Sequence, residues 1–475
     1  MLNRYQIAVA MLGLLWSGSG AAETRKPNVL FLFSDDQRAD TLSALGNPAL
    51  RTPAVDRLVR RGTVISRAYC MGGNNAAVCM PSRAMLMSGR SLFRIHEQLD
   101  HQETWPEKFG QAGYSTFMTG KWHNGANSAL RSFQRGKAVF LGGMGNPFEL
   151  PLQDISSEHT FVNKRVSGEH SVKLFADAAV AFLQQQDGAA PFLCYVSFNA
   201  PHDPRTAPVS YHDRLNRKKP PVPSNFLSQH PFNNGEMVIR DETLAPWPRT
   251  PEIVQQHLAD YYAYIEFLDD QIARILHALD ASGHAENTII VFSSDHGLAI
   301  GSHGLLGKQN LYDHSMRAPL IFVGPGIPKG KLSDAMCYLY DIFPTLGELA
   351  GVPALDGSEG RSLGPVLAGK STTHRDAIFT SYRNVQRAVR DDRWKLIVYP
   401  QINKTQLFDL RSDPFEMHDL AADPRHPALV KHLTSVLQRE QALAGDSQRL
   451  TTDNPQPLEF DFSTVRRRAG ARGNE

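Results

Sequence analysis

The chain has 475 residues, of which 41% are hydrophobic and 21% are charged. This length suffices for one large domain and a smaller one, and the composition is that of a globular protein with a substantial core. Lysine and arginine together number 50 against 48 acidic residues, a formal net charge of +2. That balance argues against nucleic acid as the main partner.

The first 22 residues have the pattern of an export signal. Residues 1–6 contain Arg4 and no acid, residues 7–16 are nearly all apolar, and residues 20–22 are small, as at a cleavage site. The apolar run is too short for a permanent membrane span, and no later run is long enough, so we expect no stable membrane insertion. We therefore predict a signal peptide over residues 1–22 and a mature periplasmic or secreted protein.

Short apolar runs rich in β-branched and aromatic residues alternate with longer helical patterns, which predicts an α/β fold. The runs expected to be buried strands are Asn28–Ser34, Ser115–Thr119, Phe192–Asn199 and Thr288–Ser294. A helix is predicted to begin at Pro53, with Thr52 as its N-cap and Gly62 after its end. A long amphipathic helix is predicted between Pro251 and Ser282.

Two regions depart from this alternation. Ala207–Thr250 holds several prolines and little periodicity, so we expect a long surface insertion there. After Thr373, strand-like pieces such as Trp394–Tyr399 predict a second, smaller α+β region. The predicted organisation is a large N-terminal domain over 23–373, a C-terminal subdomain over 374–450 and a partly disordered tail over 451–475. Basic residues of the tail, expected to be solvated, are Arg466, Arg467, Arg468 and Arg472.

Polar residues follow each predicted strand, at the end where open α/β sheets bind ligands. They are Asp35 and Asp36, Lys121 and His123, His202 and Asp203, and Asp295 and His296. An aspartate after a strand is often a turn or cap residue, a lone lysine is usually a solvated surface group, and a lone histidine is more often a structural hydrogen-bonding residue. Because four strand ends deliver acids, histidines and a lysine to one edge of the sheet, a shared site is the better interpretation.

These residue types suit the transfer of an anion beside a hard cation. Carboxylates such as those of Asp35, Asp36 and Asp295 are the ligands that Ca²⁺ and Mg²⁺ prefer. The candidate anion-binding cations are Lys121 and Lys308. The candidate acid–base groups or ligands are His123, His202 and His296.

The four cysteines, Cys70, Cys79, Cys194 and Cys337, show neither a disulfide framework nor CxxC spacing. We expect all but Cys79 to be buried structural thiols. Cys79 belongs to a specific string, Cys79-Met80-Pro81-Ser82-Arg83. Arg83 is expected on the first turn of a helix, where it pairs with a carboxylate or holds a modified residue. The N-terminus of such a helix also favours an anion beside Cys79.

This string resembles the C-x-P-S-R signature of the type I, formylglycine-dependent sulfatases. Further segments similar to that family follow in its order: Pro27–Arg38, Thr52–Leu58, Thr119–Gly125, Ala200–Pro204, Ser294–Gly297, His303–Lys308 and Asp341–Leu346. The resemblance covers most of the chain. It implies an alkaline-phosphatase-like α/β fold, with a central, mostly parallel sheet flanked by helices and a smaller C-terminal α+β subdomain.

The resemblance also implies residue roles. Cys79 would be oxidised to formylglycine by a formylglycine-generating maturation enzyme, and the aldehyde hydrate would be the nucleophile. Ca²⁺, or Mg²⁺ in its place, would be held by Asp35, Asp36, the modified Cys79, Asp295 and His296. His296 would bind the sulfate if it does not bind the metal. Arg83 and His123 would support the formylglycine, Lys121 and Lys308 would bind sulfate, and His202 would protonate the departing alcohol.

We therefore expect a sulfatase that acts on a sulfated carbohydrate of glycosaminoglycan or algal type. The alternatives are a choline or aryl sulfatase, or a phosphate or phosphonate ester hydrolase of the same superfamily. A non-catalytic carbohydrate-binding protein is a third interpretation, and it predicts an intact thiol at Cys79. Candidate substrate contacts, for which an ordinary solvated position is the alternative, are His96, His101, Arg205, Arg214, Lys218, Lys219 and Arg383.

Overall fold

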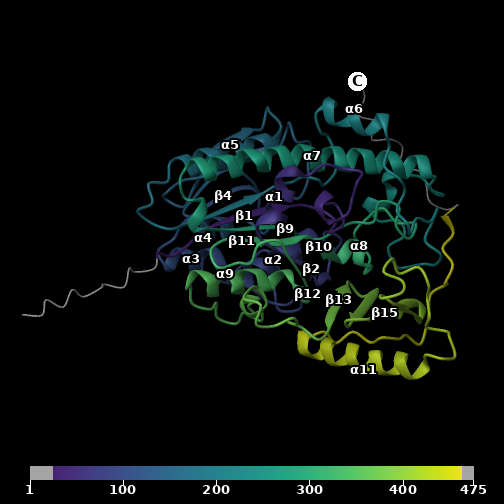
Figure 1. The fold of residues 1–475 in the computed structure, drawn as a ribbon. Coiled ribbons are helices and arrows are strands. Elements are labelled where there is room, and N and C mark those ends of the chain that lie inside the picture. Colours follow the sequence, from purple (N-terminus) through teal and green to yellow (C-terminus); the bar gives the residue numbers. More distant parts are fainter. Residues whose placement is uncertain (1–24, 463–475) are drawn as a thin grey trace, which may run out of the picture.

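The computed structural model describes residues 25–462, so the predicted signal peptide and the four tail arginines lie outside the described residues. Within them, a central eleven-stranded sheet lies between layers of helices (Figure 1). From edge to edge its strands are β10 (Arg317–Ala318), β2 (Thr63–Tyr69), β11 (Leu320–Val323), β9 (Thr288–Ser294), β1 (Asn28–Ser34), β8 (Phe192–Ser197), β4 (Ser115–Lys121), β5 (Arg135–Phe140), β6 (Pro151–Ile155) and β7 (Phe161–Val166), with β12 (Lys331–Tyr338) beside β2.

The strands β9, β1, β8, β4 and β5 at the centre are parallel, so their carboxyl ends meet at one edge of the sheet. β1, β8 and β9 are buried along their whole length, as their continuous apolar sequences predict. β1 and β9 have the predicted bounds. β8 ends at Ser197, two residues before the prediction, and β4 continues beyond Thr119, so Lys121 is the last residue of the strand rather than part of a loop.

Helices cover both faces of this sheet and confirm the predicted α/β architecture (Figure 1). One core contains Leu30 and Leu32 of β1, and the other contains Phe31 and Phe33, because successive side chains of a strand face opposite sides. The first core is covered by α1 (Pro53–Arg61), α5 (Ser171–Gln184) and α7 (Pro251–Ala281). The second is covered by α2 (Cys79–Ser88), α3 (Trp105–Gln111) and α9 (Ile342–Ala350). The other helices are α4 (Ala126–Ser132), α6 (Val209–Arg217), α8 (Asp313–Met316), α10 (Gly364–Leu367) and α11 (Pro427–Ala444).

A smaller five-stranded sheet, with α11 packed against it, forms the predicted α+β region (Figure 1). Its order is β16 (Lys404–Asp409), β15 (Trp394–Tyr399), β14 (Gln386–Arg390), β13 (Ile378–Tyr382) and β3 (Gly72–Gly73). At the β3 edge, a Cβ on Gly72 would lie 1.9 Å from the Ser381 carbonyl oxygen, so this pairing requires glycine. The smaller sheet therefore reaches the segment that leads into Cys79.

The insertion Ala207–Thr250 is mostly irregular, as expected, but it contains the helix α6 and a short 3₁₀ helix, η2 (Arg240–Leu244). The sequence does not predict α6, because Leu215 is the one buried residue of this helix and the segment therefore shows no apolar periodicity. The expectation of a surface segment was also wrong in part, since Asp241, Glu242 and Arg249 are buried.

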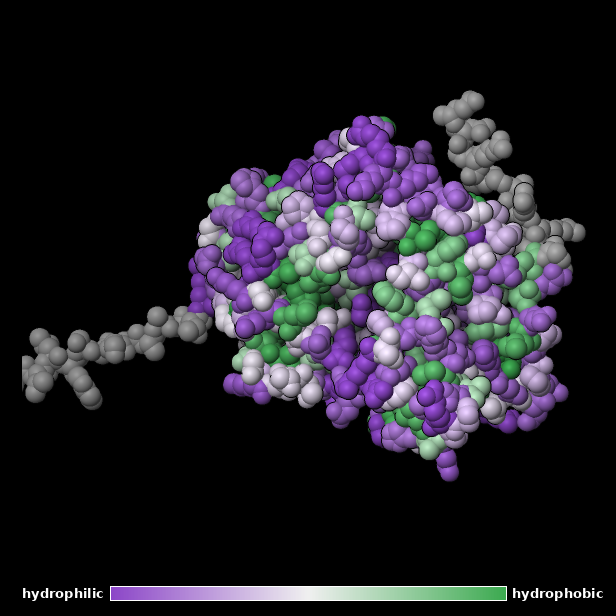
Figure 2. Space-filling model, turned by 45° about the vertical axis from the view of Figure 1, so that its right-hand side comes forward, coloured by the Kyte–Doolittle hydropathy of each residue, from purple (hydrophilic) through white to green (hydrophobic). Residues whose placement is uncertain are grey.

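The four cysteines are free and buried, in agreement with the absence of a disulfide framework. The face drawn in Figure 2 is mostly hydrophilic, and its hydrophobic residues gather in small groups beside a hollow near the middle of the view. No helix between residues 25 and 462 combines the length and the apolar character needed to cross a membrane.

The start of α1 is held by a different residue from the predicted cap. Thr52 occupies the N-cap position, but its hydroxyl donates to Asp56 at 2.9 Å and caps no helix N–H. Asp269 of α7 instead accepts hydrogen bonds from the N–H groups of Ala54 and Val55, at 2.8 and 2.9 Å. A carboxylate at a helix N-terminus accepts hydrogen bonds from the free N–H groups and interacts favourably with the helix dipole.

Replacing Asp269 with alanine should therefore lower the free energy of unfolding by about 1–3 kcal/mol, because two buried N–H groups lose their acceptor. Urea denaturation would measure the change. The control is Asp280→Ala on the same helix, which removes a half-exposed pair with Arg57 and should cost about 0.5 kcal/mol or less. Equal losses in the two variants would contradict the capping role.

Three buried histidines, His230, His303 and His314, lie where the insertion meets the loop that follows β9. The His303 ring stacks on Tyr312 with a centroid distance of 3.8 Å, and its Nδ1 lies 3.2 Å from Nε2 of His314. Its Nε2 lies 3.0 Å from the carbonyl oxygen of Glu416 in the C-terminal region. Burial lowers the pKa of His303 to about 4 and that of His230 to about 3.

These histidines predict a loss of stability in acid. They stay neutral in the folded protein, whereas the unfolded chain takes up their protons below a pH of about 6.5, so the free energy of unfolding falls as pH drops from about 6.5 towards 4. His303→Asn should weaken that dependence, while His418→Asn, at an exposed position, should not. Urea denaturation at pH values across this range gives the comparison, and identical pH dependence in wild type and His303→Asn would refute it.

Candidate active site

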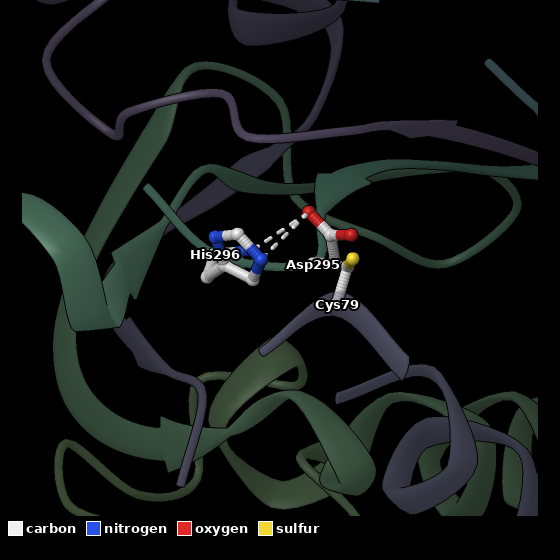
Figure 3. A group of neighbouring side chains, drawn as sticks. All are labelled: Cys79, Asp295 and His296. Atoms are coloured by element: carbon white, nitrogen blue, oxygen red, sulfur yellow. Dashed lines mark hydrogen bonds and ion pairs between the residues drawn. The ribbon is translucent and has the colours of Figure 1, made fainter. Parts of the chain in front are cut away.

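The carboxyl ends of the central strands and the beginning of α2 form a buried polar cluster. Asp35 and Asp36 follow β1, and Asp295 and His296 follow β9. Cys79 is the first residue of α2, and Figure 3 shows its thiol beside Asp295 and His296. Asp36 has a left-handed backbone (φ 66°), which departs from strand alternation and lets two successive carboxylates share the cluster.

Arg83 holds two of the carboxylates. Its Nε donates to Asp295 Oδ2 at 3.2 Å, and its Nη2 lies 3.6 Å from Asp35 Oδ1. Its Nη1 donates to the Ser197 hydroxyl at 2.6 Å, and the guanidinium lies over the ring of Phe33. Arg83 lies on the second turn of α2 and not on the first, because the helix begins at Cys79 itself. It is therefore a fully buried connector between the strand ends.

The two candidate lysines each pair with one aspartate. Lys121 Nζ lies 2.5 Å from Asp35 Oδ2 and donates to the Cys79 sulfur at 3.6 Å. Lys308 Nζ donates to both Asp36 oxygens, at 2.8 and 3.0 Å. Both lysines are buried, so their charges face the cluster and not bulk water.

The environment of Cys79 favours a negative charge at its side chain. Burial by itself would raise the pKa of the thiol, but Lys121, Lys308 and the hydrogen bonds of His123 and His296 lower it well below its usual value. The sulfur lies 3.5 Å from His123 Nδ1. Two lysines and a helix N-terminus thus surround one atom, an arrangement that stabilises an anion there.

The histidines differ in their orientation. His296 Nδ1 donates to the Gly297 carbonyl at 2.9 Å, so its Nε2 faces Asp36, whose Oδ1 lies 3.4 Å away. His202 likewise places Nδ1 2.7 Å from the carbonyl oxygen of Asp203, and its Nε2 lies 3.7 Å from Asp36 Oδ2. In both rings a backbone carbonyl selects the nitrogen that faces the site.

The donor set fits a hard divalent cation. Oxygens of Asp35, Asp36 and Asp295 come within 4.8 Å of one another. Asp35 Oδ1 is buried without a hydrogen-bond partner, so it keeps a free lone pair. Burial would lower the pKa of His296, but the carboxylates of Asp295 and Asp36 raise it to about 9, so its Nε2 carries a proton in the metal-free cluster. Ca²⁺ and Mg²⁺ take carboxylate oxygens of this kind. The His296 nitrogen is a less usual ligand for them, and its 3.4 Å approach to Asp36 leaves both predicted roles, metal and sulfate binding, open.

A cavity of about 210 Å³ opens onto Cys79. Its polar lining comes from Cys79, His123, His202, Arg240, Asp241, Lys308 and Gln309, and its apolar lining from Ala76, Ala77, Met144 and Ile239. The insertion therefore supplies part of the pocket wall, through residues 239–241. Arg240, Asp241 and Gln309 were not predicted as site residues, because nothing in their local sequence marks them as neighbours of Cys79.

The predicted substrate contacts lie elsewhere. Arg214 pairs with Glu266, Arg383 with Glu236 and His96 with Asp100. Arg205 lies over the ring of Tyr261 and contacts His257. Five of the seven are exposed: His96, His101, Lys218, Lys219 and Arg383. Among the described residues that line the cavity, none of these seven occurs.

Comparison with known proteins places this arrangement in a family. The family model described as Sulfatase matches residues 27–352, which is more than half of the chain. A second model, described as N-sulphoglucosamine sulphohydrolase, C-terminal, matches residues 301–443. The two matches together include both sheets and all the residues of the buried cluster.

Curated relatives are similar over most of their length. The N-acetylglucosamine-6-O-sulfatase of Bacteroides thetaiotaomicron is 26% identical, over 88% of this chain and 87% of that protein. The choline-sulfatase of Rhizobium meliloti is 28% identical, over 87% and 86%. A solved structure in complex with its substrate D-glucosamine-2-N,6-O-disulfate has a TM-score of 0.76 at 24% identity, covering 89% of this chain and 99% of that one. A phosphonate monoester hydrolase of Agrobacterium radiobacter has a TM-score of 0.69 at 23% identity, covering 92% and 100%. These two structural likenesses show the fold.

Because the carboxylate cluster fits a divalent cation, we expect chelation to destabilise the protein. Dialysis against EDTA should lower the melting temperature, and Ca²⁺ or Mg²⁺ should restore it, since a cation present at 100 times its dissociation constant stabilises by about 2.7 kcal/mol. Asp35→Asn should respond less, because it lacks one anionic ligand. Differential scanning calorimetry measures both proteins. A wild-type melting temperature that is unchanged by chelation and by added cations would contradict a metal at these carboxylates.

Proposed function

The chain belongs to the sulfatase family, the hydrolases of sulfuric esters, and on that premise we propose that it removes sulfate from a carbohydrate through a formylglycine at residue 79. The observation that carries the proposal is the setting of Cys79. It lies at a helix N-terminus, beside Lys121 and His123, at the base of a cavity. A hydrated aldehyde there would present an oxygen nucleophile where negative charge is stabilised.

A divalent cation, Ca²⁺ or Mg²⁺, would be held by Asp35, Asp36, Asp295, His296 and residue 79. It would supply Lewis-acid chemistry, lowering the pKa of a hydroxyl and neutralising sulfate oxygens. The three carboxylates are already balanced by Arg83, Lys121 and Lys308. The two positive charges of the cation would then match two negative charges, one on the sulfate monoester and one on an oxyanion at residue 79.

The first half of the reaction transfers the sulfuryl group. One hydrate oxygen of residue 79 attacks sulfur as the bond from sulfur to the alcohol oxygen breaks. Lys121 and Lys308 bind the sulfuryl oxygens, where charge shifts in the transition state. His202 Nε2 gives a proton to the departing alcohol, because a sugar alkoxide is a poor leaving group. Its Nδ1 is held by the Asp203 carbonyl, which leaves Nε2 towards the site.

The second half releases sulfate and restores the residue. The remaining hydroxyl of residue 79 loses its proton to His123, the carbon–oxygen bond to sulfate breaks and the aldehyde reforms. Water then adds to regenerate the hydrate. An unmodified serine or cysteine lacks the second hydroxyl and therefore this route, which is the chemical reason for oxidising Cys79.

The size of the cavity and the names of the relatives support a sugar as the alcohol component of the sulfate ester. A volume of about 210 Å³ lies below the ~300–1,000 Å³ typical of drug-sized ligands, so it suits a single ring. Relatives named N-acetylglucosamine-6-O-sulfatase, Delta 4,5-hexuronate-2-O-sulfatase and ulvan-active sulfatase point to the same substrate class. A choline or aryl sulfate is the alternative. The export pattern of residues 1–22 supports a periplasmic or secreted location, and the Cys79 string supports recognition by a maturation enzyme.

The proposal predicts a preference for sulfate over phosphate esters. With 4-nitrophenyl sulfate and 4-nitrophenyl phosphate, kcat/KM should favour the sulfate by at least about 100-fold, or ~2.7 kcal/mol in transition-state free energy. Cys79→Ala should lose the sulfate activity and keep its melting temperature. A preference for phosphate, or sulfate turnover that survives in Cys79→Ala, would overturn the reaction class.

A second assay tests the alcohol. Sulfate release should be faster from at least one of three saccharides, N-acetylglucosamine-6-sulfate, an unsaturated hexuronate-2-sulfate disaccharide or an ulvan oligosaccharide, than from choline sulfate. Ion chromatography of inorganic sulfate gives the rates. Release from choline sulfate alone would reject the carbohydrate assignment while leaving the sulfatase assignment intact.

A further inference from the structure

Three consecutive residues of the insertion contact the two loops that carry His202 and Lys308. They are Arg240, Asp241 and Glu242, which open the 3₁₀ helix η2 and are here called the 240–242 clamp. We propose that this clamp positions His202 and Lys308 for the reaction, so that the insertion governs catalysis as well as forming a wall of the pocket. The inference rests on the proposed function, which assigns His202 and Lys308 their roles.

Arg240 fixes the loop that follows β8. Its guanidinium pairs with both carboxylate oxygens of Asp203, with Nη1 2.9 Å from Oδ1 and Nη2 bonded to Oδ2. Asp203 in turn contacts the His202 ring twice, through its carbonyl oxygen at 2.7 Å from Nδ1 and through Oδ1 at 3.5 Å from the same atom. A bidentate pair defines orientation as well as distance. Arg240 therefore constrains the residue that orients His202.

Asp241 and Glu242 fix the loop that carries Lys308. Asp241 Oδ2 accepts from Gln309 Nε2 at 2.9 Å, one residue after Lys308. Glu242 accepts the N–H groups of Leu306 and Gly307 at 2.8–3.0 Å, just before it. The carboxylates of the clamp thus bind the backbone and side chains on both sides of the lysine.

Burial and close packing separate the clamp from an ordinary surface contact. Asp241 and Glu242 are 6% and 3% exposed, and Arg249, fully buried, donates to the Glu242 carboxylate at 2.6 Å. A Cβ at Gly307 would lie 2.9 Å from Cβ of Asp241, so the loop needs glycine to come this close. Arg240 meanwhile keeps its side chain 37% exposed at the cavity, where it completes the wall.

If these contacts only anchored the insertion, their loss would affect all substrates alike. A positioning role makes a sharper prediction. Loss of Arg240 should slow substrates that need a proton from His202 and spare those that do not. Loss of the Glu242 charge should weaken the binding of sulfate oxygens by Lys308.

The experiment compares two sulfate esters in the mature enzyme, one with an activated nitrophenol and one with an alkyl or sugar alcohol as leaving group. Arg240→Met should lower kcat/KM for the poor leaving group on the order of 100-fold, the size of effect that small misplacement of a catalytic group produces. For the nitrophenyl ester the loss should stay within a few-fold, and Arg240→Lys should recover part of the difference.

The insertion supplies a matched control. Arg214 also forms a bidentate pair with a carboxylate, Glu266 of α7, but lies outside the cavity lining. Arg214→Met should leave the ratio of the two kcat/KM values at its wild-type level. Equal losses on both esters in Arg240→Met, or the same selectivity in Arg214→Met, would overturn the positioning role of Arg240.

Glu242→Gln tests the other half of the clamp, with inorganic sulfate as the probe. The inhibition constant of sulfate should rise on the order of 10-fold, because the charge-assisted hydrogen bonds that hold the Leu306 and Gly307 N–H groups just before Lys308 are weakened, while Glu266→Gln should leave it unchanged. An unchanged constant in Glu242→Gln would refute this half.

The proposed function is judged separately by His202→Ala. If His202→Ala lowers kcat/KM equally for the two sulfate esters, the proton-donor role and the Arg240 inference both fail. The inhibition constants still decide the role of Glu242.

Discussion

The structure depends on a balance of charge in its interior. Three carboxylates, those of Asp35, Asp36 and Asp295, are buried beside three cations, those of Arg83, Lys121 and Lys308. Removing one partner of such a pair typically costs about 3–5 kcal/mol, because a buried charge remains unpaired. Parallel strands bring the acids to one edge, and Arg83 on α2 ties two of them together. The arrangement is held ready for an anion and a divalent cation and is not optimised for stability alone.

Much of the fold follows from local sequence. β1 and β9 have their predicted bounds, since a continuous apolar run bounded by polar residues defines a strand buried on both faces. The strand ends also predicted which polar residues meet, because parallel strands end at the same edge. Contacts between distant segments could not be predicted in this way. The local pattern predicts Thr52 as the N-cap of α1, but the N–H groups at the start of that helix donate to Asp269 on α7.

The insertion was the least predictable region, for a physical reason. Its order comes from polar contacts with distant loops, such as Arg240 with Asp203 and Glu242 with Leu306 and Gly307, and polar contacts leave no periodicity in the sequence. Its basic residues stand out in the sequence, but Arg214 pairs with Glu266 of α7, outside the cavity. Arg240 and Asp241, which belong to no motif, supply part of the pocket wall together with Ile239. Part of the pocket wall therefore comes from a segment whose fold is set by its neighbours.

The central claim is that the anion-stabilising position at the start of α2 carries an aldehyde. Mass spectrometry of the peptide that contains Cys79, from protein produced in a host with the maturation enzyme, tests it most directly. The account predicts the mass of the formylglycine residue or its hydrate in place of cysteine, in proportion to the sulfatase activity of each preparation. An active preparation in which the peptide carries only the unmodified thiol would contradict the account.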